Sequence, residues 1–194
     1  MCRALIILKY KTPEPWAENI ATSMDAFLPD HAAAEKKASS MAMTMVAHYP
    51  DKPELVAAMI ELALEELNHF RAVVKIMHER GLALLPDEKD PYVNALRRHC
   101  RQGDEIYLMD RLLIAGIVEA RGAERFGLIA EALAEGELKR FYDSITRSEL
   151  AHQDLFLELA EKYSDHSEVH LRLDELLIIE AEIVSNLPLR LALH

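Results

Sequence analysis

Two Glu-x-x-His motifs are the residues of this chain best suited to chemistry. Glu66 and His69 form the first motif, and Glu149 and His152 form the second. An α-helix advances about 100° and 1.5 Å per residue, so side chains at i and i+3 lie on one face and can reach one metal ion. Each motif therefore predicts a pair of metal ligands carried by a helix.

A further glutamate precedes each motif at nearly the same distance. Glu35 lies 31 residues before Glu66, and Glu119 lies 30 residues before Glu149. One isolated motif is close to what the 9 histidines of the chain would give by chance, so the joint pattern carries the prediction. The alternative is a set of four surface glutamates and two structural histidines.

Two antiparallel helical hairpins, each offering Glu and Glu-x-x-His, make the inward-facing ligand set of a ferritin-like di-iron or di-manganese bundle. The separation of about 30 residues suits helices of around 25 residues. We predict an all-α fold, a ferritin-like four-helix bundle with additional N-terminal, linking and C-terminal helices. Carboxylates with only two imidazoles suit iron or manganese better than zinc or copper, and iron is the default.

Start and stop signals place the helices that must position these ligands. Asp90-Pro91 opens a short linking helix, Gly81 and Gly136 end longer ones, and Asp30 is expected to cap a helix that restarts after Pro29. The predicted helices cover about residues 13–27, 30–48, 53–80, 91–101, 104–134, 137–163 and 166–186. Gly116 and Gly122 inside one of them indicate close approach of a neighbour or substrate.

Composition indicates one helical domain spanning residues 1–194. The chain is 51% hydrophobic and has only 6 Gly and 8 Pro. Cys2 and Cys100 form no C-x-x-C motif, which favours a reducing cytoplasm over a disulfide framework. No segment approaches the roughly 20 apolar residues of a membrane span, so we expect no membrane partner.

Charge alone argues against a nucleic-acid partner, because the net charge is −11. The average hides an asymmetry, since residues 66–147 hold 13 Lys and Arg against 14 Asp and Glu. The most basic cluster contains Arg97, Arg98 and Arg101. Such a cluster is usually a solvated helix end, and phosphate contact is the alternative.

The other seven histidines are predicted to be ordinary surface or packing residues, without a partner at metal-ligand spacing. They are His31, His48, His78, His99, His166, His170 and His194.

Four runs resemble the bacterial tRNA 2-methylthio-isopentenyl-adenosine hydroxylase family. They read AEKKA at 34–38, LEELNHF at 64–70, VEARGAERF at 118–126 and RSELAH at 147–152. The run at 118–126 discriminates best, because many families share the ferritin-like motif. The resemblance covers about residues 25–163.

This resemblance implies an O2-dependent hydroxylation of the isopentenyl group on a modified adenosine beside the tRNA anticodon. It implies two iron ions and electrons from a separate reductase or ferredoxin. The tRNA would present the base from a single-stranded loop. The implied iron ligands are Glu35, Glu66, His69, Glu119, Glu149 and His152. The candidate phosphate contacts are Lys36, Lys37, Arg97, Arg98, Arg101, Arg121 and Arg125, and the last two could instead pair with acids and orient helices.

The sequence leaves other functions of ferritin-like proteins as alternatives. They are a quinone hydroxylase, a ferroxidase or iron-storage protein, a manganese catalase and a bundle without enzymatic activity.

Overall fold

The computed structural model describes residues 6–194, and Cys2 lies outside them. The described part of the chain is built of helices, with no strand, so the all-α prediction is confirmed. Two compact units divide it: residues 19–88 with 191–193, and residues 6–18 with 89–190 and 194. The single domain predicted from composition stays a prediction. The helices are α1 (Glu14–Thr22), α2 (Met24–His48), α3 (Pro53–Glu79), α4 (Pro91–Arg97), α5 (Asp104–Ala132), α6 (Glu137–Tyr163) and α7 (His166–Asn186).

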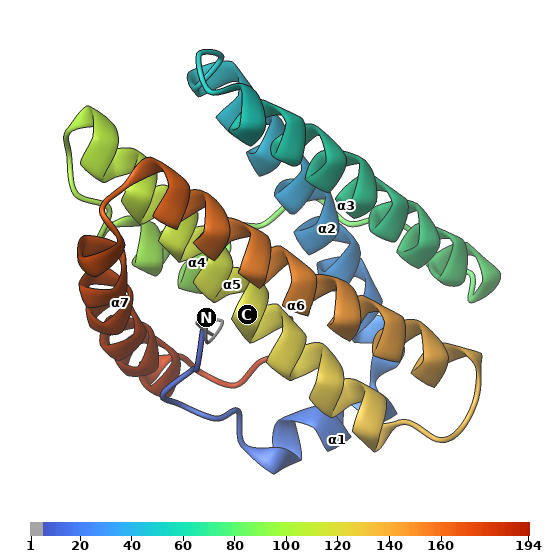
Figure 1. Cartoon of the computed structure of the whole chain (residues 1–194). Coiled ribbons are helices and arrows are strands. Elements are labelled where there is room, and N and C mark those ends of the chain that lie inside the picture. The colour runs from blue at the N-terminus through green and yellow to red at the C-terminus, as the bar shows by residue number, and fades with distance from the viewer. Residues whose placement is uncertain (1–5) are drawn as a thin grey trace. The chain divides into compact units, whose positions relative to one another are not determined.

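Helices α2 and α3 form the hairpin of the first unit and lie side by side (Figure 1). Pro53 occupies the first position of α3, where its missing N–H costs nothing. At the other end, Gly81 takes φ 73° and donates to His78 O, while Leu82 N–H reaches back to Met77 O. These two bonds are a Schellman motif, so the predicted stop at Gly81 is confirmed.

The predicted helix restart at Asp30 is wrong. Helix α2 begins at Met24 and runs through Pro29, which is buried within it. Asp30 does not cap a helix, and its carboxylate accepts a bond from Leu193 N–H at 2.7 Å. Burial of Phe27 and Leu28 on the same helix outweighs the one hydrogen bond that a proline removes near a helix start.

The second unit contains the hairpin of α5 and α6, with α4 and α7 packed against it (Figure 1). Asp90 and Asp165 cap α4 and α7 by accepting bonds from backbone N–H groups of the first turn. The close approach predicted at Gly116 is confirmed. A Cβ there would lie 2.9 Å from Ile6 Cδ1 and 3.3 Å from Phe156 Cβ.

None of the helices in residues 6–194 is long and apolar enough to cross a membrane.

Candidate metal centre

The first unit brings Glu35, Glu66 and His69 together inside its hairpin. Glu35 projects from α2, and Glu66 and His69 lie one turn apart on α3. His69 Nδ1 is 3.5 Å from Glu35 Oε2 and 3.7 Å from Glu66 Oε2. Both carboxylates are buried, and each of the three residues offers a ligand atom within 4.8 Å of the others. The predicted first half of the ligand set is therefore assembled as one triad.

Electrostatics within this triad favour a cation. Burial alone would raise the pKa of Glu35, but hydrogen bonding with His31 and His69 lowers it well below its usual range. Burial alone would lower the pKa of His69, but Glu35 and Glu66 raise it to about 9. The two carboxylates thus hold a positive charge between them. An imidazole ligates a metal only after losing its proton, so metal binding here would release that proton.

His31 is a packing histidine, one of the two roles predicted for it, and it also contacts a candidate metal ligand. It is fully buried on α2, and its Nε2 lies 2.6 Å from Glu35 Oε1. The bond engages one carboxylate oxygen and leaves Oε2 on the side of His69. A polar partner of this kind fixes the orientation of a ligating carboxylate. The available signal was spacing, because His31 precedes Glu35 by one helical turn.

The second unit assembles an equivalent triad from α5 and α6. Glu119, Glu149 and His152 are all buried. His152 Nδ1 lies 4.0 Å from Glu119 Oε2 and 3.8 Å from Glu149 Oε2. The three residues again offer ligand atoms within 4.8 Å of one another. Gly122 lies one turn after Glu119, where an added Cβ would stand 3.7 Å from Glu149 Oε2. The neighbour at Gly122 is thus a carboxylate of the triad, but it lies at ordinary van der Waals distance and not in the close approach that was predicted.

Arg121 and Arg125, two of the predicted phosphate contacts, are buried. Arg121 is 0% exposed and donates to Glu124 Oε2 at 2.6 Å and to Glu180 Oε1 at 2.9 Å. Arg125 donates to Thr12 Oγ1, and its guanidinium lies 5.0 Å from the ring centre of Trp16. This placement favours the alternative role, in which both residues orient helices.

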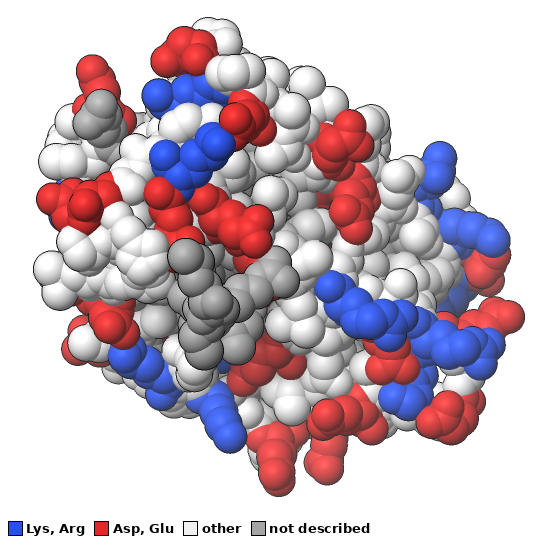
Figure 2. Space-filling view, in the orientation of Figure 1, with Lys and Arg blue, Asp and Glu red and all other residues white. Residues whose placement is uncertain are grey.

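The other five basic candidates lie on the surface or at its margin, in two sets. Lys36 Nζ donates to Asp87 at 2.7 Å and Lys37 Nζ to the Glu88 carbonyl, both within the first unit. In the second unit the Arg101 guanidinium donates two hydrogen bonds to the buried Asp110 carboxylate, whereas Arg97 and Arg98 are exposed at the end of α4. On the face drawn in Figure 2, Lys and Arg side chains stand among Asp and Glu rather than in one continuous patch.

Among the remaining histidines, His48, His78 and His99 are exposed as predicted. The prediction is wrong for His166 and His170, whose Nε2 atoms lie 3.3 Å apart beside a shared carboxylate.

Almost the whole chain matches a protein-family model. A family model described as tRNA-(MS[2]IO[6]A)-hydroxylase (MiaE) matches residues 2–194. The chain belongs to this family. The resemblance inferred from the four sequence runs is thereby confirmed.

Two curated relatives carry the name tRNA 2-(methylsulfanyl)-N(6)-isopentenyladenosine(37) hydroxylase. The relative from Pseudomonas putida is 33% identical and aligns with 94% of this chain and 89% of its own length. The relative from Salmonella typhimurium is 33% identical over 70% of this chain and 50% of its own length.

A solved structure is also similar. It is described as protein 43 with aldehyde deformylating oxygenase activity, from Synechococcus. It is 32% identical, with a TM-score of 0.89, and the match covers 95% of this chain and 92% of that chain. The prediction of an all-α, ferritin-like fold is confirmed.

The donor set in each triad fits iron. Two carboxylates neutralise one divalent ion, and an imidazole completes a mixed oxygen and nitrogen set of the kind that iron and manganese accept. Burying two carboxylates side by side is costly unless a cation compensates them.

Proposed function

We propose that this chain hydroxylates the isopentenyl group of 2-methylthio-isopentenyl-adenosine next to the tRNA anticodon. The observation that carries the proposal is the pair of Glu/Glu/His triads, whose four carboxylates are buried, in a member of this hydroxylase family. Two iron ions would be held by Glu35, Glu66, His69, Glu119, Glu149 and His152.

The iron ions, when bound, would reduce O2 and supply the oxidant for a C–H bond, which no amino-acid side chain provides. The protein residues would hold the ions and keep water away. Buried Leu62 and Val73 flank the first triad along α3, and buried Ile145 and Phe156 flank the second along α6. His31 would hold the Glu35 carboxylate in its ligating orientation.

Each turnover places one oxygen atom of O2 in the product and the other in water. The substrate C–H bond supplies two of the four electrons that reduce O2, so each turnover also consumes two electrons and two protons from outside the substrate. We infer that a separate reductase or ferredoxin supplies the electrons. A tRNA substrate and an electron-carrying partner are both consistent with a cytoplasmic enzyme.

Arg97 and Arg98 are our first candidates for phosphate contact, because they are exposed at the end of one helix. Lys36, Lys37 and Arg101 would have to exchange or share their present carboxylate and carbonyl partners. Replacing Arg97 and Arg98 by Ala should weaken tRNA binding. The slope of the logarithm of the binding constant against the logarithm of the salt concentration should become shallower by the equivalent of about one to two phosphate contacts. An unchanged salt slope would remove these residues from the tRNA surface.

The experiment that tests the proposal combines iron-loaded protein, a chemical reductant and O2 with isopentenylated tRNA. The tRNA is then digested to nucleosides, and mass spectrometry should find a product heavier by one oxygen atom. Glu119→Ala should abolish the product while helicity is retained. Glu131→Ala, an exposed glutamate on the same helix, is the matched control and should leave the activity intact. Absence of product with reduced, iron-loaded wild type would refute the proposal.

The solved oxygenase structure favours one second candidate, an oxygenase that acts on an aldehyde. The same protein should therefore be given an aldehyde in parallel, with formate as the measured product. Formate without hydroxylated nucleoside would favour this second function over the first.

A further inference from the structure

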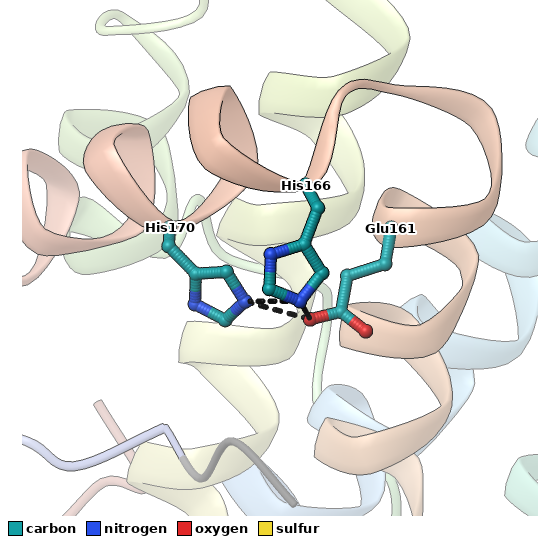
Figure 3. Close-up of side chains that lie close together, drawn as sticks. All are labelled: Glu161, His166 and His170. Carbon is teal, nitrogen blue, oxygen red and sulfur yellow. Dashed lines mark hydrogen bonds and ion pairs between the residues drawn. The ribbon is translucent and has the colours of Figure 1, made fainter. Parts of the chain in front are cut away.

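A second cluster of metal-ligating side chains lies outside the two triads, where α6 passes into α7. Glu161 lies in the last turn of α6, and His166 and His170 lie one turn apart at the start of α7. Figure 3 shows the two imidazoles and the carboxylate turned toward one another. We propose that Glu161, His166 and His170 bind a divalent transition-metal ion of the zinc class.

The distances among the three ligand atoms suit such an ion. Glu161 Oε1 lies 3.4 Å from His166 Nε2 and 2.7 Å from His170 Nε2, and the two Nε2 atoms are 3.3 Å apart. Zinc bonds of about 2.0–2.2 Å place neighbouring ligand atoms of a tetrahedron about 3.3 Å apart. The distances from His166 Nε2 to Glu161 Oε1 and to His170 Nε2 already match this value. A small rotation of the Glu161 carboxylate would lengthen the remaining 2.7 Å distance to His170 Nε2.

The turn between the helices holds the histidines in register. Asp165 Oδ1 accepts bonds from Ser167 N–H at 2.9 Å and from Glu168 N–H at 3.2 Å, which fixes the first turn of α7. His166 and His170 then project from one face because they are four residues apart. The carbonyl end of α6, which carries Glu161, favours a cation.

The exposure and donor types distinguish this cluster from the triads. The His166 side chain is 74% exposed, and Glu161 and His170 are partly exposed, so an ion could enter from solvent and keep water in its open position. Two imidazoles with one carboxylate favour zinc and its neighbours more than a set with two carboxylates does. A bound ion would join the end of α6, the helix of Glu149 and His152, to the start of α7.

Zinc titration of the iron-loaded full chain tests the proposal. After desalting, elemental analysis should find about one zinc ion per chain, with the iron content unchanged. His166→Ala and His170→Ala should each weaken zinc binding at least about 100-fold, since even partners of ligands contribute about 10–100-fold. His78→Ala, an exposed histidine on α3, is the matched control and should bind zinc as wild type does.

Two results would overturn the proposal. Zinc binding that persists in both histidine variants would place the ion elsewhere, and zinc that displaces iron mole for mole would place it in the triads. Co2+ gives an independent readout, because its visible absorption should appear in wild type and vanish in His170→Ala. Hydroxylation of tRNA is measured separately, so its failure would leave the zinc result standing.

Discussion

Replacing Glu180 by Ala should destabilise the protein strongly, although this residue is remote from both triads in the sequence. Glu180 lies on α7, is 0% exposed, and accepts bonds from Arg121 Nε at 2.9 Å and from the Tyr92 hydroxyl at 3.1 Å. Burial alone would lower the pKa of Arg121, but Glu180 and Glu124 outweigh it and raise the pKa. The guanidinium stays charged when Glu180 is removed, because an arginine in a protein is effectively always protonated and Glu124 remains beside it.

The magnitude follows from the partners that remain. Breaking a buried ion pair by removing one member costs about 3–5 kcal/mol. Arg121 would keep Glu124 and the Tyr10 carbonyl, at 2.6 and 2.9 Å, which places the loss near the lower end. We expect about 3 kcal/mol, which in a chain of this size lowers the melting temperature by about 6–12 °C.

Urea unfolding followed by circular dichroism, at equal iron loading, measures this loss. Glu182→Ala is the matched control on the same helix, because Glu182 is exposed, and it should change the free energy of unfolding by less than about 0.5 kcal/mol. The double variant Arg121→Met with Glu180→Leu should recover most of the stability, since it leaves neither member of this buried ion pair without its partner. A loss below about 1 kcal/mol in Glu180→Ala would refute the reasoning.

Three further predictions concern acid, packing and metal. Burial alone would raise the pKa of Asp90, but His194 and the first-turn N–H groups lower it to about 2. The ionised carboxylate therefore stabilises the folded protein above about pH 4, and this contribution is lost as the pH falls toward 2. Over that range the urea midpoint of Asp90→Asn should fall less than that of wild type. Gly116→Ala should lower the free energy of unfolding by about 1–3 kcal/mol, because the added Cβ would press against Phe156. Gly127→Ala should raise the free energy of unfolding by up to about 1 kcal/mol through helix propensity, and equal effects of the two variants would contradict this packing argument. Removing iron with a chelator should lower the melting temperature reversibly, because the buried carboxylates lose their counter-ions; an unchanged temperature would argue against buried iron.

Helix positions could be predicted where the signals are local. Pro53 and Gly81 bound α3, Asp90 caps α4, and α6 and α7 have the predicted limits because adjacent residues carry the caps, stops and apolar periodicity. Pro29 is one exception, since burial of its neighbours carries α2 through a residue that usually starts or ends a helix. The helices predicted for residues 13–27 and 91–101 also end earlier than expected, at Thr22 and Arg97.

The sequence by itself also determined which residues are candidate iron ligands, because spacing along a helix fixes which side chains share a face. Only the tertiary structure decided which groups surround the charges. Glu180 is 59 residues from Arg121, and the sequence contains no signal that pairs them. Glu161 lies beside His166 and His170 only because the turn between α6 and α7 sets the direction of α7 relative to the end of α6. Burial makes each such partner decisive, since a buried charge needs compensation that an exposed one obtains from water.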